Sequence, residues 1–351
     1  MRLEVVETKK QKNLFINFRR NLYRNDDYYV STTEFTFEMI FNQTTDFAKK
    51  CVIRPIMVID NSKVLAEAIM IKNPNDNFVQ VSFFEALEGV EEAVELIKVY
   101  SRLFAKENNV NRIIVGLYGH LSYGVGLTVD INRPNTFDSI YTKRYYINYF
   151  KEYKKHELCA FSSKLDRLYP YMINRKTEII IRPIKLNDFE NEMKLFGDIC
   201  NKTIGNTFLF SKTDENHFYQ LISDMKTFLK KENILFAFHK GVLVGFIFWH
   251  PDYNEILSKG KHESILSIAI KYVLNQNKIK RVKLNAIGVL EKYEGLVTMH
   301  LLKEASKYMS NFEIIETNFV WKNNVKSTRI NSHLLKNIER TFVVFEENLC
   351  E

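Results

Sequence analysis

Runs of β-branched and aromatic residues occur along the chain in pairs, with a short turn-forming stretch between the two members of each pair. Such a pair predicts an antiparallel β-hairpin, because the apolar runs suit strands and the polar stretch suits a tight turn. The sequence contains two of these pairs, at 51–60 with 64–71 and at 234–238 with 242–248. The second strands align with each other, so we read the chain as an internal repeat.

A strand, a helix and a further strand follow each predicted hairpin. The helices carry apolar residues at a spacing of three to four, which places those residues on one helix face. Strands that alternate with helices after an antiparallel hairpin predict an α/β (α+β) protein with a mixed sheet. The elements after the hairpins are predicted at 78–84, 91–108 and 112–117 in the first half, and at 281–289, 295–309 and 313–321 in the second.

Further helices are predicted before each hairpin and between the second hairpin and the strand that follows it. The first hairpin follows an amphipathic helix at 10–24. The second hairpin follows helices at 186–201 and 213–230, and an inserted helix is predicted at 258–276. The two halves therefore repeat one order of elements, apart from this insertion.

Two domains are expected from the length of 351 residues and from the repeat. We place the boundary near Asn174-Arg175-Lys176, which gives an N-terminal domain at 1–174 and a C-terminal domain at 175–351. No stretch rich in Gly, Ser or Pro marks a linker there. We therefore expect the two domains to be docked and not loosely tethered.

Composition excludes several classes of protein. With 46% hydrophobic residues, 12 glycines and 6 prolines, the chain is not predicted to be disordered. The longest apolar stretch is too short to span a membrane, and the charged start shows no secretory leader. The four cysteines are far apart and show no metal-ligand spacing, so neither a zinc site nor a disulfide framework is predicted. We expect a cytoplasmic protein without a bound metal.

The net charge of +8 raises the question of nucleic-acid binding. The excess of basic residues is spread over both halves and occurs in short doublets, which usually form solvated surfaces. Nucleic acid is therefore not the expected partner. A mildly basic protein would also suit an anionic cofactor.

Several short motifs appear in a fixed order. The first half contains Phe-Arg-Arg-Asn-Leu-Tyr-Arg-Asn-Asp at 18–26, Phe-Phe-Glu at 83–85 and Tyr-Thr-Lys-Arg-Tyr-Tyr at 141–146. The second half contains Pro-Asp-Tyr-Asn at 251–254, Gly-Val-Leu-Glu-Lys-Tyr at 288–293, Trp321 with Asn-Val-Lys-Ser at 324–327, and Arg-Thr-Phe-Val-Val-Phe-Glu at 340–346. Their shared order, more than any single motif, resembles a bacterial family of proteins with two GNAT acyl-CoA N-acyltransferase domains in tandem.

The resemblance implies that an acyl-CoA, such as acetyl-CoA, is the co-substrate. GNAT folds hold the pyrophosphate of coenzyme A on backbone N–H groups at a loop that opens a helix, where unpaired donors and the helix dipole favour an anion. The preceding strand offers backbone partners to the pantetheine arm. By this resemblance the cofactor-binding residues are Ile287, Gly288, Val289, Gly295, Leu296, Val297, Thr298 and Asn324.

The predicted cofactor loop departs from the family pattern at three positions. Glu294 places a carboxylate where a positive or neutral residue is expected, and like charges repel. Val297 and Met299 place side chains where the backbone must approach the pyrophosphate closely. The first half has only the acidic stretch 87–92 at this point, so we expect the C-terminal half to hold the cofactor site and the N-terminal half to be a degenerate copy.

Acyl transfer to nitrogen needs a base that takes the proton of the amine. Asp252 and Glu255 are the candidates, although Asp252 and Asn254 also suit a helix cap or a turn. Asn324 likewise suits a helix N-cap.

Four residues are candidates for the acceptor side. Asn254, Tyr141, Tyr145 and Tyr146 are candidates to bind the acceptor substrate, and the alternative for the tyrosines, which their type favours, is that they seal the joint between the domains. His250 and His300 have no evident partner, so we expect packed or surface histidines.

The function predicted from these observations is an N-acyltransferase, most simply an N-acetyltransferase. It would move an acyl group from acyl-CoA to an amine of a small molecule or amino acid by direct attack. One alternative is an aminoacyl-tRNA-dependent transferase of the peptidoglycan-bridge type, for which tRNA would be a partner. Another alternative is a binding or scaffold protein that keeps the fold without the chemistry. The segment 292–299 discriminates between enzyme and scaffold, since exposed backbone N–H groups there favour the enzyme.

Overall fold

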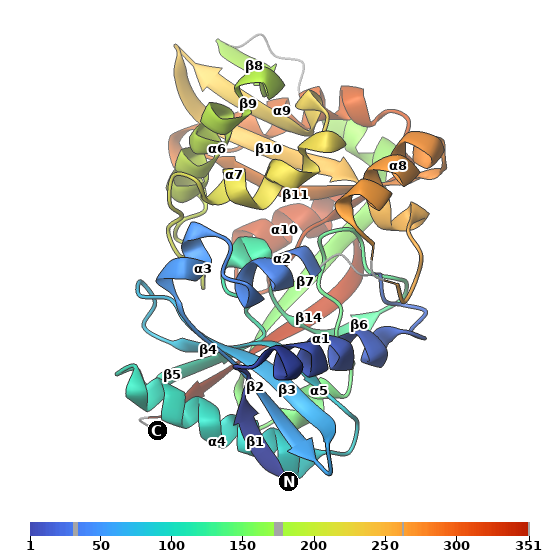
Figure 1. The fold of residues 1–351 in the computed structure, drawn as a ribbon. Coiled ribbons are helices and arrows are strands. Elements are labelled where there is room, and N and C mark those ends of the chain that lie inside the picture. The colour runs from blue at the N-terminus through green and yellow to red at the C-terminus, as the bar shows by residue number, and fades with distance from the viewer. Residues whose placement is uncertain (31–33, 172–177, 262, 350–351) are drawn as a thin grey trace. The chain divides into compact units, whose positions relative to one another are not determined.

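The computed structural model describes residues 1–30, 34–171, 178–261 and 263–349. These residues form two compact units (Figure 1). Unit 1 comprises Met1–Cys159, Ser258–His262 and Arg340–Glu351, and unit 2 comprises Ala160–Leu257 and Glu263–Glu339. The predicted boundary at 174–176 lies outside the described residues. The closing strand near the C-terminus belongs to unit 1, so the units are not simply the two halves of the sequence.

Unit 1 is a twisted sheet with helices on both faces. Its strands are ordered β1-β2-β3-β4-β5-β14, with β6 against β14, and β4 and β5 form its parallel pair. The elements are β1 (Arg2–Val5), α1 (Lys9–Tyr23), α2 (Glu34–Phe41), α3 (Asp46–Lys50), β2 (Val52–Asp60), β3 (Lys63–Lys72), β4 (Val79–Ala86), α4 (Glu91–Glu107), β5 (Arg112–Val115), β6 (Leu127–Ile131), α5 (Tyr146–Tyr149) and β14 (Asn337–Asn348).

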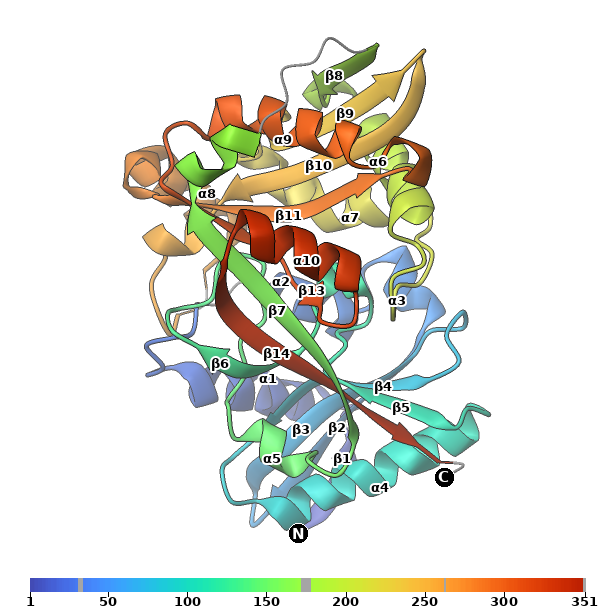
Figure 2. The same cartoon turned by 180° about the vertical axis from the view of Figure 1, so that it is seen from behind.

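The core of unit 1 lies between the sheet and α4 (Figure 2). Every second residue of β3, namely Ala66, Ala68 and Met70, faces this core, as the alternation of a strand requires. The intervening residues, among them Glu67, point to the other face, which α1 covers. The start of α1 is fixed by a capping box in which Thr8 and Gln11 satisfy each other's backbone N–H groups.

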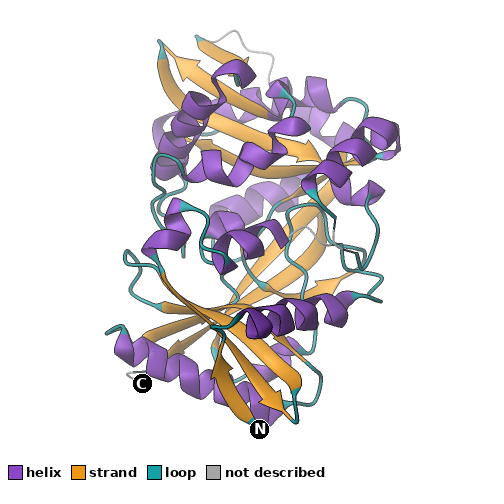
Figure 3. Ribbon diagram, viewed as in Figure 1, coloured by secondary structure: helices purple, strands orange, loops and turns teal. Residues whose placement is uncertain are grey.

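Unit 2 repeats the arrangement, with strands ordered β7-β12-β11-β10-β9-β8 and helices on both faces (Figure 3). β11 and β12 form its parallel pair. The elements are β7 (Lys154–Lys164), β8 (Ile179–Pro183), α6 (Phe189–Thr203), α7 (His217–Ile222), β9 (Ile234–His239), β10 (Val242–Pro251), α8 (Ile265–Asn275), β11 (Arg281–Val289), α9 (Leu296–Met309), β12 (Ile314–Thr317), β13 (Val320–Trp321) and α10 (Val325–Leu334).

Three predicted elements of unit 2 differ from the structure. The inserted helix predicted at 258–276 begins only at Ile265, after its N-cap Ser264. The helix predicted at 213–230 is reduced to α7 and a 3₁₀ turn at Ser223–Thr227. The side chain of Asn201 binds both the N–H and the C=O of Thr213, which holds that residue outside the helix. The strand predicted at 313–321 is broken into β12 and β13, because the chain leaves β11 after Thr317 and β13 pairs with β7.

Three of the four cysteines are described, and Cys51, Cys159 and Cys200 are buried free thiols. In the described part of the chain, no set of three or more His, Cys, Asp or Glu side chains is arranged to hold a metal ion. A search of the same residues for a helix of sufficient length and apolarity to cross a membrane finds none.

Candidate functional site

In unit 2, the parallel strands β11 and β12 pair for only four residues and then separate. Leu284 and Thr317 are the last pair, and the N–H of Asn318 donates to the carbonyl of Leu284 at 2.8 Å. Residues 285–289 continue beside β10 on one edge, and within the described residues β12 does not follow them on the other. We call this separation the unit 2 fork and its closed end the vertex.

A β-bulge lies at the vertex. In the register of β10 with β11, Phe248 pairs with Ala286 while the next residue, Trp249, pairs with Leu284, so Asn285 is the extra residue. Its carboxamide oxygen accepts a hydrogen bond from Nδ2 of Asn318 at 3.1 Å. A bulge bends its strand and re-aims side chains, and bulges are common beside active sites. Asn285 is therefore the polar side chain that the fold places where the strands part.

Beyond the vertex, β11 becomes partly exposed. Asn285, Ala286 and Ile287 are half-buried, whereas the four residues before them are buried. Gly288 and Val289 are buried again. A Cβ atom at Gly288 would lie 2.3 Å from Oγ1 of Thr203 on α6, so this glycine is required by packing within unit 2. Ile287 and its neighbours before it are thus the part of the predicted strand that a ligand can reach.

The helix after the fork begins without a side-chain cap. Gly295 is the N-cap of α9, with φ of 80°, and it makes no side-chain cap hydrogen bond to the described residues. It is exposed, as are Glu294 and Leu296, and a Cβ atom there would meet nothing within 4 Å. The first N–H groups of a helix have no partner within the helix and lie at its positive end. At the start of α9, the N–H of Leu296 donates to the carbonyl of Glu294 at 3.1 Å. This terminus has the exposed backbone that an anionic group requires.

The residues after Gly295 are placed differently from the sequence expectation. Val297 was expected to place its side chain in the way of the pyrophosphate. Instead its side chain is fully buried in the core under α9 and does not obstruct the helix start. Thr298 and Met299 are half-buried. Val297 can therefore contribute to a ligand site at this terminus through its backbone but not through its side chain.

The charge of Glu294 is matched by a lysine. Its carboxylate pairs with Nζ of Lys326 on α10, and both side chains are exposed. Asn324 is the N-cap of α10, where its side-chain oxygen accepts from the N–H of Ser327 at 3.1 Å. The capping interpretation of Asn324 thus describes what its oxygen does in this structure. The ion pair between Lys326 and Glu294 brings a basic side chain to the start of α9.

The predicted bases lie at the start of β11. Asp252 is fully buried, and its carboxylate caps a 3₁₀ turn by accepting from the N–H of Asn254. Glu255 is exposed, and its Oε2 accepts from the N–H groups of Lys280 and Arg281, at 2.6 and 3.1 Å. Asn285 lies four residue steps beyond Arg281 along the strand, or roughly 13 Å at 3.3 Å a step. The carboxylate of Glu255 thus holds the backbone at the start of β11, and that of Asp252 holds the 3₁₀ turn beside it.

Unit 1 contains a corresponding fork between β4 and β5. Val81 and Val115 are the last pair, and Phe83, in the register shift that follows, has φ of 50°. Here every residue of β4 is buried. Oγ of Ser82 donates to the carbonyl of Leu117, which ties the two strands together beyond their last pair. The same strand geometry therefore ends in a packed interior in unit 1 and in a partly exposed strand in unit 2.

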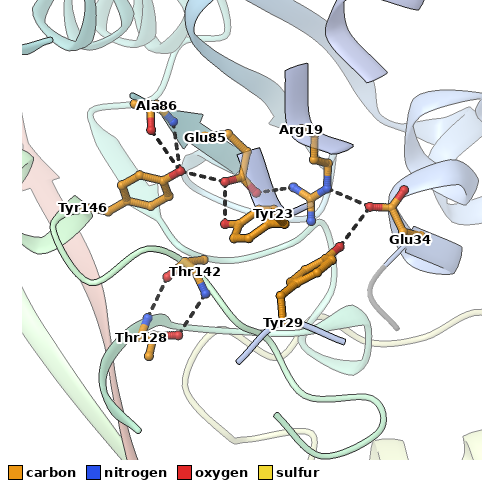
Figure 4. A network of polar contacts seen from close by, with 9 residues as sticks. All are labelled: Arg19, Tyr23, Tyr29, Glu34, Glu85, Ala86, Thr128, Thr142 and Tyr146. Atoms are coloured by element: carbon orange, nitrogen blue, oxygen red, sulfur yellow. Dashed lines mark hydrogen bonds and ion pairs between the residues drawn. The ribbon is translucent and has the colours of Figure 1, made fainter. Parts of the chain in front are cut away.

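A buried polar network fills the space beside this second fork (Figure 4). The guanidinium of Arg19 donates to Glu85 at 2.5 Å and to Glu34 at 3.1 Å, and all three side chains are at most 3% exposed. The hydroxyls of Tyr23 and Tyr146 donate to the other oxygen of Glu85, at 2.6 and 2.8 Å. Burial raises the pKa of Glu85, and the Arg19 guanidinium opposes that shift.

The network unites the three first-half motifs. Arg19 and Tyr23 come from 18–26, Glu85 from 83–85 and Tyr146 from 141–146. Tyr145 donates to the carbonyl of Ala86, and Tyr141 donates to Asp26. The tyrosines predicted to bind the acceptor thus hold β4 and the loop after α1 within unit 1. The sequence motifs identified these residues, but nothing in their spacing showed that they meet.

One carboxyl beside the network has no hydrogen-bond partner within the described part of the chain. Glu67 on β3 is fully buried, and neither of its oxygens has a hydrogen-bond partner among the described residues. Burial and the nearby Glu85 carboxyl raise the pKa of Glu67 well above its ordinary value. Both effects favour the neutral form of Glu67.

Sequence reasoning did not single out Asn285 and Asn318. Neither belongs to a motif, and both owe their place to the point where β11 and β12 part. The available signal was indirect, because a polar residue interrupts the apolar end of a predicted strand at Asn285.

Comparison with known proteins supports the fold. No protein-family model matches the chain, and no curated protein matches it in sequence. A tandem GNAT protein from the clavulanic acid biosynthesis pathway is similar in structure over 99% of both chains, with a TM-score of 0.56 at 10% identity.

Two further solved structures are also similar to this chain in fold. One is a conserved protein of unknown function from Enterococcus faecalis, described as a probable N-acyltransferase, which matches 99% of this chain and 72% of its own with a TM-score of 0.56 at 7% identity. The other is a GCN5-related N-acetyltransferase from Sphaerobacter thermophilus, which matches 84% of this chain and 80% of its own with a TM-score of 0.50 at 10% identity. The chain therefore has the mixed α/β fold of tandem GNAT proteins, as its sequence predicted.

Proposed function

We propose that this protein is an N-acyltransferase and that unit 2 binds its acyl-CoA. One observation carries the proposal. In unit 2, β11 parts from β12 at a bulge, its next residues are partly exposed, and the helix that follows starts at the exposed and uncapped Gly295. A strand edge and a helix N-terminus in this order provide backbone partners for an extended polar arm and donors for a pyrophosphate.

Each part of the cofactor has a matching part of the chain. The backbone N–H groups at Gly295, Leu296 and Val297 would hold the pyrophosphate, with Lys326 adding positive charge nearby. The N–H of Leu296 would then exchange its 3.1 Å hydrogen bond to the carbonyl of Glu294 for one to the ligand. The backbone around Ile287 would hold the pantetheine arm, while Gly288, Val289 and Thr298 support that surface. The cofactor supplies an activated acyl group. The chain's residues hold that group in place.

Unit 1 is not proposed as a cofactor site. Its fork is tied by Ser82 and filled by the Arg19 and Glu85 network, so no residue of β4 is exposed to a ligand. This contrast between the two units supports the expectation that the N-terminal domain is a degenerate copy. Under this proposal, unit 1 serves the fold.

The acceptor in this proposal is an amine of a small molecule or amino acid. Asp252 and Glu255 stay the predicted bases, with Asn254 beside them. An amine acceptor must lose a proton as it is acylated, and a carboxylate within reach or one water away provides that. The structural contacts of these two acids compete with that role, so their variants require a kinetic test and a folding control.

The test is calorimetric titration with acetyl-CoA and CoA. Gly295→Glu adds a carboxylate at the start of α9, and Gly241→Glu is a matched control in the hairpin turn of the same unit. Both glycines have φ of 80°, which L side chains rarely adopt, and a Cβ atom at either meets nothing within 4 Å, so neither substitution causes a steric clash. We expect micromolar binding by the natural protein, at least tenfold weaker binding by Gly295→Glu, and no change in Gly241→Glu. Absence of binding by the natural protein would refute the proposal.

A further inference from the structure

A chain of hydrogen bonds at the vertex fixes the orientation of Asn285. Nδ1 of His250 lies 2.9 Å from the carbonyl oxygen of Pro251, which only accepts, so Nδ1 carries the proton. Nε2 of the neutral ring is then an acceptor, and Nδ2 of Asn285 donates to it at 3.4 Å. The Asn285 oxygen accepts from Asn318. The nitrogen of the Asn285 carboxamide is thus turned toward His250 and its oxygen toward Asn318.

His250 is itself held firmly. Its ring is fully buried, stacks on Tyr253 with centroids 5.7 Å apart, and contacts Phe248 at the same centroid distance. Burial and the neighbouring Lys283 lower the pKa of His250 to about 3. A protonated ring would carry N–H groups on both nitrogens and would face the amide nitrogen of Asn285 with a second donor. The neutral ring is the form compatible with the observed chain.

The vertex is also the reacting end of the proposed cofactor site. The start of α9 lies past the C-terminal end of β11, and the vertex lies at the other end of the separated segment 285–289. Phosphates at the helix start and an arm along the strand therefore carry the thioester toward Asn285. This step rests on the function proposed above.

We propose that the carboxamide of Asn285 contacts the thioester end of the bound acyl-CoA, and that His250 and Asn318 are positioning residues that fix its orientation. Asn285 then contributes to the binding of the acylated end of the ligand and not to the binding of its nucleotide end. Asn285 is a binding residue in this proposal, and His250 acts only through it.

The first experiment compares two probes on the full chain, acetyl-CoA and adenosine 3′,5′-bisphosphate, which is the nucleotide end of coenzyme A. We expect Asn285→Ala to bind acetyl-CoA at least tenfold more weakly and to bind the bisphosphate within twofold of the natural protein. Asn191→Ala, which removes an exposed amide on α6, is the control and should change neither affinity. Unchanged acetyl-CoA affinity in Asn285→Ala would overturn the proposal.

The second experiment tests the positioning role. His250→Gln can place an oxygen acceptor near the position of Nε2, whereas His250→Leu cannot. We expect acetyl-CoA affinity to fall in His250→Leu and to recover largely in His250→Gln. Equal losses in both variants would indicate that His250 serves packing only and would overturn its assigned role.

A third measurement needs neither a variant nor a ligand. Nitrogen-15 NMR of the natural protein should show His250 protonated at Nδ1 and neutral down to pH 5. A ring protonated at Nε2 would overturn the proposed hydrogen-bond chain.

Failure of the inference can be distinguished from failure of the proposed function. If the natural protein does not bind acetyl-CoA, the proposed function and this inference are both refuted. If the natural protein binds acetyl-CoA and Asn285→Ala binds it with the same affinity, only the inference is refuted.

Discussion

Glu67 on β3 lies directly opposite Glu85 on β4 in the register of the sheet, and both carboxyls are buried in unit 1. Only one of them is compensated. Glu85 accepts hydrogen bonds from Arg19, Tyr23 and Tyr146, while Glu67 has no hydrogen-bond partner in the described part of the chain. Like charges directly opposite each other on adjacent strands are destabilising, and burial increases the cost. The pair therefore favours one ionised and one neutral carboxyl.

Glu67→Gln should stabilise the protein at neutral and alkaline pH. The pKa of Glu67 is raised in the folded state, so its protonated form favours folding at low pH and this contribution is lost as pH rises above the ordinary value of 4.5. We expect a gain of roughly 1–3 kcal/mol at pH 8 and a smaller one at pH 4.5. Urea unfolding at both pH values measures this difference. The exposed variant Glu88→Gln is the control, and a gain independent of pH would contradict the prediction.

Arg19→Met should destabilise unit 1 strongly. The substitution removes the guanidinium from Glu34 and Glu85 and leaves both carboxyls buried without their cationic partner. Breaking a buried ion pair from one side costs about 3–5 kcal/mol. Denaturant unfolding of Arg19→Met and of the natural protein measures this loss of stability.

Arg20→Met provides the matched control for this change. Arg20 is the next residue, and its pair with Glu38 is exposed and 3.8 Å long. Its loss should change the free energy of unfolding by no more than about 0.5 kcal/mol. Similar losses in Arg19→Met and Arg20→Met would show that the buried network does not stabilise the fold in the way we infer.

Glu294→Gln should tighten the binding of acetyl-CoA. The change removes a negative charge beside the helix start and releases Lys326 from its ion pair, so the local potential becomes more positive. We expect affinity to rise about two- to tenfold and to depend more steeply on salt. Titration calorimetry at two salt concentrations measures both effects.

Glu304→Gln is the control for that prediction. It breaks the comparable exposed pair with Lys307, further along α9 from its start. Its acetyl-CoA affinity should match that of the natural protein. Weaker binding in Glu294→Gln would mean that the carboxylate contributes to the ligand site and does not oppose it.

Local pattern was sufficient to predict most elements and their order. The strand at Arg281–Val289 has the bounds that were predicted, and the hairpin strands differ from prediction by only a few residues at their ends. These elements follow from the period of apolar residues and from turn residues, which are properties of neighbouring positions. The tandem GNAT fold followed from that order together with the motifs.

The predicted strand at 313–321 shows where local pattern fails. Its residues suit one continuous strand, but the chain changes partners after Thr317 and leaves the fork beside Asn285. Strand pairing of this kind is decided between segments far apart in the sequence, so periodicity cannot predict it.

The sequence by itself determined the order of helices and strands, the repeat, and the motifs that resemble tandem GNAT proteins. Only the tertiary structure decided that Arg19, Glu85 and Tyr146 meet in one buried network and that Asn285 stands at the vertex of the unit 2 fork. The physical reason is one of range. Helix and strand periods depend on adjacent residues, whereas burial, pairing and pKa shifts depend on which distant side chains the fold brings into contact.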